Sequence, residues 1–177
     1  MTETRSNEKT MVFVDVRNIL GAIGSNLRYC LVDFDGLIKR LTNGRYLIRP
    51  YAYDGNCCEG RNNESLHNYL HRHGFEVRLS NIHSIDMEQK GVDVDLATDM
   101  VLFADRGCYD TAILVSGDGD FIPAVKKVKD MGKIVEVACF ENTINDELRL
   151  SADRYHPLDD VPLMKLRDLR GSEEASQ

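Results

Sequence analysis

Short apolar runs with the character of β-strands alternate along the chain with segments whose apolar residues recur at helical spacing. The clearest strand is Ala-Ile-Leu-Val at residues 112–115, an unbroken run that suits a strand buried on both faces. The same pattern predicts the other elements: strands over residues 10–16, 45–53, 75–79 and 133–139, and helices over residues 19–28, 33–41, 66–73, 93–104, 121–131 and 145–152. Residues 54–63 and 81–90 have no clear period and are predicted to be loops.

This alternation of strands and helices predicts an α/β fold with a mainly parallel sheet covered by helices on both sides. We expect a single domain over residues 10–166, between a flexible N-terminal segment at residues 1–9 and a polar C-terminal tail at residues 167–177. In open sheets of this kind, ligands bind outside the carboxyl ends of the strands, where the strand order reverses. Polar residues at strand ends are therefore the first candidates for a site.

Composition narrows the class of protein. The chain has 177 residues, 42% of them hydrophobic, and no run approaches the roughly 20 apolar residues of a membrane helix. Its polar N-terminus lacks the apolar core of a signal peptide, so we expect a cytoplasmic protein with no membrane partner. The five cysteines show no metal-site spacing, and an odd count argues against a disulfide framework. A net charge of -7 argues against a nucleic-acid coat protein, but not against an enzyme whose carboxylates bind a metal.

Carboxylates gather where two of the predicted strands end. Asp118 and Asp120 lie in a Ser-Gly-Asp-Gly-Asp turn that follows residues 112–115, and Asp15 lies near the end of the first strand. If these strands are neighbours at the reversal of strand order, Asp15 and Asp118 converge. The alternative is that Asp118 and Asp120 only cap the next helix, whose N-terminus favours acidic residues.

A helix predicted between those strands adds three acids. Asp95 and Asp99 are four residues apart and share a face, whereas Asp93 and Asp99 are six apart. Asp93 and Asp99 can serve one site together only if Asp93 belongs to the turn that enters the helix. A set of carboxylates without His or Cys suits hard ions such as Mg²⁺ or Mn²⁺.

Three segments resemble the signature segments of the NYN domain family, the LabA-like branch of the PIN-like nucleases. They are FVDVRN at residues 13–18, KGVDVDLATD at residues 90–99 and AILVSGDGDF at residues 112–121. The resemblance implies a PIN-like Rossmannoid three-layer sandwich with strand order 3-2-1-4-5, and hydrolysis of RNA that depends on Mg²⁺ or Mn²⁺. It also implies a catalytic and metal-binding acidic cluster, which on this sequence comprises Asp15, Asp93, Asp99 and Asp118, with Asp120 beside it.

Four more residues are predicted to contact the substrate. The resemblance implies that Asn18 and Ser116 are polar supports of the acidic cluster. Arg17 and Lys90 are the basic residues that we expect to bind a phosphate group. RNA is the expected partner, and the sequence leaves the oligomeric state open, a homo-oligomer included.

Histidines and tyrosines offer weaker candidates. His67 and His71 are four residues apart on a predicted helix, but residue 68 is Asn instead of the Glu of a zinc-protease motif. We therefore expect these histidines on a solvated helix face. Tyr51 and Tyr53 alternate along a predicted strand, and we expect them to pack in the core instead of stacking on bases.

Two other functions compete with a ribonuclease. One is a catalytically silent RNA- or protein-binding regulatory module on the same fold, which a single sequence does not separate from an enzyme. The other is a haloacid-dehalogenase-type phosphatase, because LVDFDG at residues 31–36 resembles the nucleophile motif of that class. Against the phosphatase, the first strand ends at Asp15, and Ile122 stands where the late motif needs an Asp. We therefore expect Asp33 to cap a helix.

Overall fold

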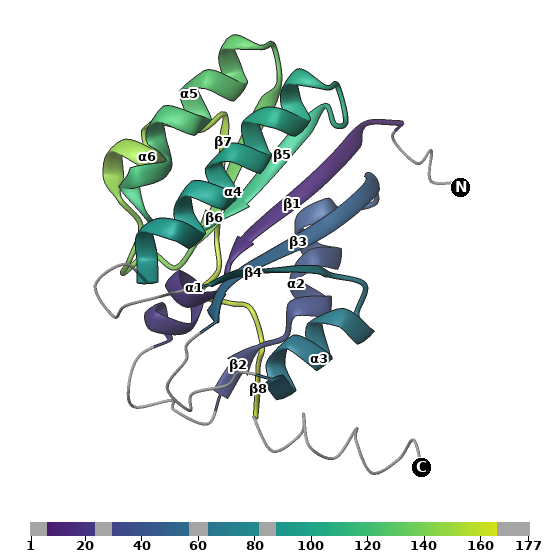
Figure 1. The fold of residues 1–177 in the computed structure, drawn as a ribbon, viewed down its shortest axis with the longest axis vertical. Helices are drawn as coiled ribbons and strands as arrows, with labels where there is room; N and C mark the ends of the chain where they lie inside the picture. Colours follow the sequence, from purple (N-terminus) through teal and green to yellow (C-terminus); the bar gives the residue numbers. More distant parts are fainter. Residues whose placement is uncertain (1–6, 24–29, 57–63, 82–87, 166–177) are drawn as a thin grey trace.

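A six-stranded sheet forms the centre of the molecule, and helices cover both of its faces (Figure 1). The computed structural model describes residues 7–23, 30–56, 64–81 and 88–165. Along the chain the elements are β1 (Lys9–Asp15), α1 (Val16–Ala22), β2 (Cys30–Val32), α2 (Phe34–Thr42), β3 (Tyr46–Asn56), α3 (Glu64–Arg72), β4 (Glu76–Asn81), α4 (Glu88–Asp105), β5 (Thr111–Val115), η3 (Gly119–Phe121), α5 (Ile122–Asp130), β6 (Ile134–Cys139), α6 (Asp146–Ser151), β7 (Arg154–Pro157) and β8 (Leu163–Lys165).

The central sheet has the order β4-β3-β1-β5-β6-β7, and every neighbouring pair of strands in it is parallel. Numbered within this sheet alone, the order is 3-2-1-4-5-6, which confirms the predicted fold class and strand order and adds a sixth strand at one edge. The order reverses at β1, so the carboxyl ends of β1 and β5 border the crevice where such sheets bind ligands. β2 and β8 form a separate antiparallel pair.

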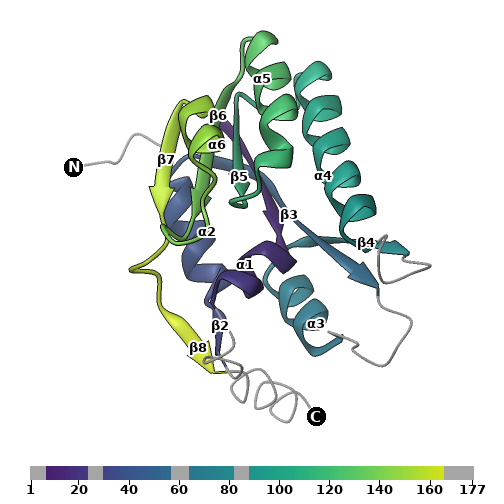
Figure 2. The ribbon, with the colours of Figure 1, turned by 90° about the vertical axis from the view of Figure 1, so that its left-hand side faces the viewer.

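Alternate residues of the central strands point into two separate cores. Val12 and Val14 of β1 pack against the apolar faces of α1, α2 and α3, whereas Met11 and Phe13 pack against those of α4, α5 and α6. Figure 2 shows the resulting layers, with α4 and α5 on one side of the sheet and α2 on the other. All five residues of β5 are buried, as its unbroken apolar run predicts. Within the described residues, none of the helices combines the length and apolar character needed to cross a bilayer.

Three element boundaries near the predicted site differ from the sequence-based expectations. α1 covers Val16–Ala22 instead of residues 19–28, of which residues 24–28 lie outside the described part of the chain. β3 continues to Asn56, three residues beyond its predicted end, because it pairs with β4 as far as Asn81. α4 begins at Glu88, five residues before the predicted start, so Asp93 lies inside the helix instead of in its entry turn. The strands β2, β7 and β8 were not predicted, because three or four residues are too few to show a period.

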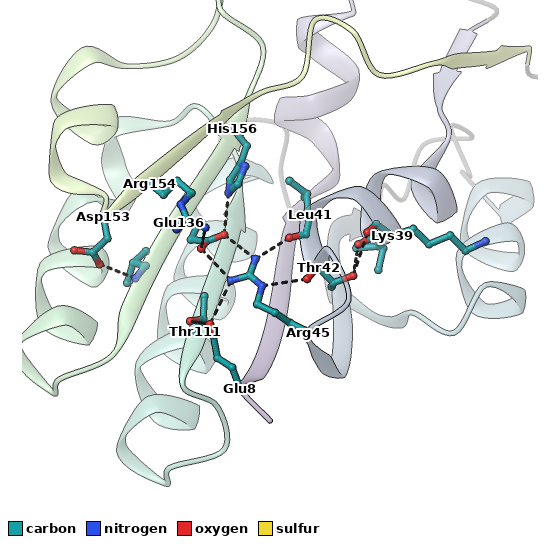
Figure 3. A network of polar contacts seen from close by, with 12 residues as sticks. Glu8, Lys39, Leu41, Thr42, Arg45, Thr111, Glu136, Asp153, Arg154 and His156 are labelled. Carbon is teal, nitrogen blue, oxygen red and sulfur yellow. Dashed lines mark hydrogen bonds and ion pairs between the residues drawn. The ribbon is translucent and has the colours of Figure 1, made fainter. Parts of the chain in front are cut away.

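An ionic network surrounds the side chain of Glu136 in β6, away from the crevice at the carboxyl ends of β1 and β5 (Figure 3). This side chain is 2% exposed. Arg45 donates one hydrogen bond of 2.9 Å to each carboxylate oxygen of Glu136, and Arg154 and His156 of β7 contact the same carboxylate at 3.2 and 2.8 Å. Burial raises the pKa of Glu136, but the contacts with His156 and Arg45 outweigh it and lower the pKa to about 2. The network links β6 and β7 to the end of α2.

Candidate active site

A cavity of about 270 Å³ lies at the carboxyl edge of the sheet, beside the reversal of strand order. Its lining comes from the end of β1, from α1 and α4, from the turn after β5 and from the loop after β6. The residues that line it are Asp15, Arg17, Asn18, Gly21, Ala22, Val92, Asp93, Asp118 and Thr143. The cavity thus brings together three of the predicted acids, Asp15, Asp93 and Asp118, with two of the predicted substrate contacts, Arg17 and Asn18.

Asp15 is the last residue of β1 and is 4% exposed. One carboxylate oxygen accepts a hydrogen bond of 3.1 Å from the backbone N–H of Asn18, so Asp15 is the N-cap of α1. The other oxygen accepts a hydrogen bond of 3.1 Å from the hydroxyl of Ser116. Burial is the main reason why the pKa of Asp15 is raised, and these two hydrogen bonds oppose it. The carboxylate is therefore held in one orientation at the end of its strand.

The turn after β5 carries Asp118 and depends on glycine. A Cβ atom on Gly117 would lie 2.5 Å from the carbonyl oxygen of Thr143 and 2.6 Å from the sulfur of Cys139, so no larger residue fits. Asp118 accepts a hydrogen bond of 2.9 Å from the backbone N–H of Asp120 and thereby caps η3. Asp118 also lines the cavity, so the capping role and the predicted site role coincide in one side chain.

Asn18 and Ser116 join the two halves of the site. The side-chain oxygen of Asn18 accepts a hydrogen bond of 2.9 Å from the backbone N–H of Gly117, which links α1 to the turn after β5. The buried hydroxyl of Ser116 donates to Asp15 and accepts a hydrogen bond of 3.2 Å from the backbone N–H of Asp118. These contacts are those of polar supports, because both residues hold the backbone and side chains that present the acids.

Negative charge is concentrated around Asp93. Burial, followed by the nearby carboxylates of Asp15, Asp118 and Asp120, raises the pKa of Asp93 to about 6. Asp120 itself is exposed and does not line the cavity. Carboxylates that repel one another in this way favour a bound cation, which would relieve the repulsion.

The other acids of α4 have different partners. Asp99 accepts a hydrogen bond of 2.9 Å from the hydroxyl of buried Tyr53, and Asp95 accepts one from Ser80 of β4. Since α4 is continuous from Glu88, Asp93 and Asp99 point in different directions, and Asp99 does not line the cavity. Lys90 belongs to α4, but its side chain lies outside the part of the chain that the structure describes.

The side-chain atoms around the cavity that could bind a metal are carboxylate oxygens and neutral oxygens, which are the ligands that hard divalent cations prefer. Within the described residues, no three His, Cys, Asp or Glu side chains are arranged so that together they hold a metal ion. Mg²⁺ in proteins commonly binds through one or two carboxylates and completes its shell with waters and substrate phosphates. Two of the three carboxylates at the cavity are enough for an ion of that kind.

Asp54 and His67 are two polar residues near the site whose roles the sequence pattern does not indicate. Asp54 falls in the segment predicted to be a loop, yet it lies in β3 and is 0% exposed. The expectation that His67 lies on a solvated helix face was wrong, because it is 8% exposed and its Nε2 lies 2.8 Å from a carboxylate oxygen of Asp54. Asp54 is an acid near the carboxyl end of a third parallel strand, which is the same signal that identified Asp15. The strand predicted over residues 45–53 ends one residue before Asp54, so this signal is not visible in the sequence pattern. Tyr51 and Tyr53 are buried in the core, as expected.

The phosphatase motif lies outside the central sheet. Asp33 follows β2, which pairs only with β8 among the described strands, and its side chain accepts a hydrogen bond of 3.0 Å from the backbone N–H of Gly36. It therefore caps α2, as predicted. Asp35 forms an exposed ion pair of 2.6 Å with Lys39 on the same helix. Neither acid lines the cavity, which argues against a phosphatase built on these residues.

The three signature segments lie within the part of the chain that a known family matches. The family model of the NYN domain matches residues 9–159, which confirms the resemblance. The low amplitude and bright protein LabA of Synechococcus elongatus is 27% identical over 123 residues, which cover 65% of this chain and only 64% of that relative. The crystal structure of a protein of unknown function from Vibrio parahaemolyticus superposes with a TM-score of 0.77 at 28% identity, covering 93% of this chain and 100% of that one.

Proposed function

We propose that this chain, which belongs to the NYN domain family of PIN-like proteins, is a ribonuclease that requires Mg²⁺ or Mn²⁺. A single observation carries the proposal. Asp15, Asp93 and Asp118 come from separate parts of the chain and line one cavity, where burial, followed by the charges of the neighbouring carboxylates, raises the pKa of Asp93 to about 6. Such a site favours a cation, and a cation beside an RNA backbone is suited to phosphodiester hydrolysis.

In this proposal, the divalent ion takes two carboxylate ligands from the set Asp15, Asp93 and Asp118, as Mg²⁺ commonly does in proteins. The bound ion supplies a Lewis acid that lowers the pKa of water and offsets the negative charge that gathers on the reacting phosphate. Ser116 and the backbone of Asn18 keep the carboxylate of Asp15 in place. The side chain of Asn18 keeps the turn after β5 against α1, so Asp118 stays beside Asp15.

The cationic side chain for the substrate is Arg17. Of the described residues that line the cavity, it is the only one with a positive charge. A guanidinium binds phosphate oxygens through charge-assisted hydrogen bonds, which would draw an RNA strand towards a cavity that is otherwise acidic or neutral. Asp120 and Asp99 lie outside the lining, and we assign them supporting roles: Asp120 adds to the local negative charge, and Asp99 anchors Tyr53.

The decisive experiment incubates the purified protein with structured and single-stranded RNA in Mn²⁺, Mg²⁺ or EDTA, beside the variant Asp118→Asn. We expect cleavage with either ion, no cleavage in EDTA, and a rate lower by roughly 100-fold or more in Asp118→Asn, by analogy with the loss of one transition-state contact. Asp130→Asn, an exposed acid at the end of α5, is the matched control and should cleave like wild type.

Two results would count against the proposal. Identical product patterns from wild type and Asp118→Asn would point to a contaminating nuclease. RNA binding without cleavage in any ion would favour a catalytically silent RNA-binding module on the same fold.

A further inference from the structure

Asp54 is a wholly buried carboxylate close to the cavity but not in its lining. It lies at the carboxyl end of β3, one residue beyond Tyr53, which pairs with Asp15 in the sheet. An ionised carboxylate is stable inside a protein only where hydrogen bonds or opposite charges replace the water it has lost. The partners of Asp54 therefore decide what it can do.

Among the described residues, contacts from β3, α3 and α1 hold Asp54. One carboxylate oxygen accepts a hydrogen bond of 2.8 Å from the backbone N–H of Gly55, and the other lies 2.8 Å from Nε2 of His67 in α3. Because an ionised carboxylate can only accept, His67 is the donor through Nε2–H. The third contact is an ion pair of 3.4 Å with Nε of Arg17 in α1.

Arg17 connects this buried pair to the cavity. Its side chain is 32% exposed, it belongs to the first turn of α1 two residues after Asp15, and it lines the cavity. A guanidinium has five N–H donors in a fixed plane, so an arginine can hold a carboxylate through Nε and bind a phosphate oxygen at the same time. Asp54 thus contacts the Nε of an arginine that also lines the cavity.

We infer that Asp54 and His67 are positioning residues that hold the guanidinium of Arg17 at the cavity, where it binds a backbone phosphate of RNA. The inference rests on the proposed ribonuclease function, because it assigns a substrate contact to the same site. Its physical basis is preorganisation. A long side chain that is already held in place loses less conformational freedom when the substrate binds, and it fixes where the phosphate lies relative to the acids.

A purely structural role for the ion pair makes the opposite prediction. If Arg17 were only the counterion of Asp54, then Asp54→Asn would release the guanidinium and strengthen RNA binding. If Asp54 positions Arg17, the same change weakens RNA binding. Asn keeps the size of Asp54 and an oxygen that accepts from His67, so the substitution removes the charge with little change in packing.

The experiment measures the affinity of a short fluorescein-labelled single-stranded RNA by anisotropy, in EDTA, over a range of salt concentrations. We expect Arg17→Ala to weaken binding about tenfold, as for loss of a hydrogen bond to a charged group, and to lower the slope of log K against log salt by about 0.7. Asp54→Asn should weaken binding by a smaller factor, and the double variant should bind no more weakly than Arg17→Ala. Arg40→Ala, which removes an exposed arginine paired with Asp160, is the control and should bind like wild type.

Steady-state cleavage in Mn²⁺ completes the test. Arg17→Ala and Asp54→Asn should raise KM by the same factors that they weaken binding, with kcat changed less than about threefold, as expected for an interaction made equally in the ground and transition states. Arg17→Lys covers the case in which Asp54→Asn does not fold, because Arg17 is partly exposed. It keeps the charge but not Nε, so it should bind more weakly than wild type.

Three results would overturn the inference: tighter or unchanged binding by Asp54→Asn, additive losses in the double variant, or wild-type affinity in both Arg17→Ala and Arg17→Lys. Its failure can be told apart from failure of the proposed function. Cleavage by wild type with an unchanged KM in the Arg17 variants rejects the inference alone. Arg17-dependent RNA binding without cleavage rejects the ribonuclease alone. A wild type that neither binds nor cleaves RNA rejects both.

Discussion

The hydroxyl of Tyr53 donates a hydrogen bond of 2.9 Å to a carboxylate oxygen of Asp99, so this acid of α4 faces β3 while Asp93 of the same helix faces the cavity. Six residues along one straight helix correspond to about one and two-thirds turns at 3.6 residues per turn, which puts the two carboxylates on different faces. The two acids therefore have separable roles.

We predict that Asp93→Asn lowers kcat for RNA cleavage by roughly 100-fold or more, as expected for a group that acts on the reacting phosphate. Asp99→Asn should lower kcat less than about tenfold, the lower end of the loss on removing a residue that supports a metal site. Asp99→Ala should instead lower stability by about 1–3 kcal/mol, because it leaves the buried hydroxyl of Tyr53 without its acceptor. Cleavage rates and thermal melts of the variants check this. A larger loss of kcat in Asp99→Asn than in Asp93→Asn would return Asp99 to the catalytic set.

The burial of Asp93, together with the charges of the neighbouring acids, should lower the stability of the metal-free protein. The pKa of Asp93 is raised from 3.8 to about 6 on folding, so the native state binds more protons between these values and loses stability as pH rises through that window. Asp93→Asn removes this penalty. In EDTA at pH 7.5 we expect the variant to melt about 2–4 °C above wild type, equivalent to about 1 kcal/mol after solvent screening. The difference should shrink at pH 4.5.

Metal should reverse this order. An ion that binds only the folded state at a hundredfold excess over its dissociation constant adds about 2.7 kcal/mol. Wild type should therefore gain more from Mn²⁺ than Asp93→Asn does, while Glu147→Gln, an exposed change on α6, should respond like wild type. If Asp93→Asn melts lower in EDTA and keeps the full Mn²⁺ shift, Asp93 is a structural acid and not a metal ligand.

Glu136 should make the fold sensitive to acid. Its folded pKa is about 2 against 4.5 in the unfolded chain, so its contribution to stability is fully present above pH 4.5 and is lost as pH falls towards 2. At pH 7 we expect Glu136→Gln to lose about 3 kcal/mol, because the largely buried charge of Arg45 loses its two-point contact with Glu136 and keeps the longer one of 3.3 Å with Glu8. The stability gap between wild type and variant should then close on acidification.

Denaturant unfolding between pH 7 and pH 2.5 measures this gap. Glu141→Gln is the control, since Glu141 and its partner Arg149 are both about half exposed and contribute little. A gap that stays constant with pH would mean that Glu136 is not ionised in the way the network implies.

The turn that presents Asp118 should not tolerate a side chain at Gly117. We expect Gly117→Ala to cost about 1–3 kcal/mol, as an overpacked site does, and to slow RNA cleavage because Asp118 moves with the turn. Gly91→Ala is the matched control, since its Cβ would come no closer than 3.9 Å to Ser80 and its place in α4 favours Ala by up to about 1 kcal/mol. Equal melting temperatures for Gly117→Ala and wild type would show that the loop holding Thr143 yields easily.

The order of strands and the acids at two strand ends were predictable from sequence. A strand buried on both faces must be apolar along its length, so β1 and β5 stand out, and the acid that ends β1 and the first acid after β5 must lie where the strands end. That logic placed Asp15 and Asp118 correctly at one end of the sheet. The signature segments added the strand order, because parallel pairing between distant strands leaves no local pattern of its own.

Only the tertiary structure decided which of the remaining polar residues meet. The direction of Asp93 depends on where α4 begins, and helix boundaries are weakly encoded in local sequence. The burial of Asp54 and His67 has a different cause. A pattern of polar and apolar positions places a polar residue at the surface unless its partner is known. Asp54 and His67 are partners from different elements, and they meet only when α3 packs beside the end of β3. Long-range contacts of this kind depend on packing, which no local period reports.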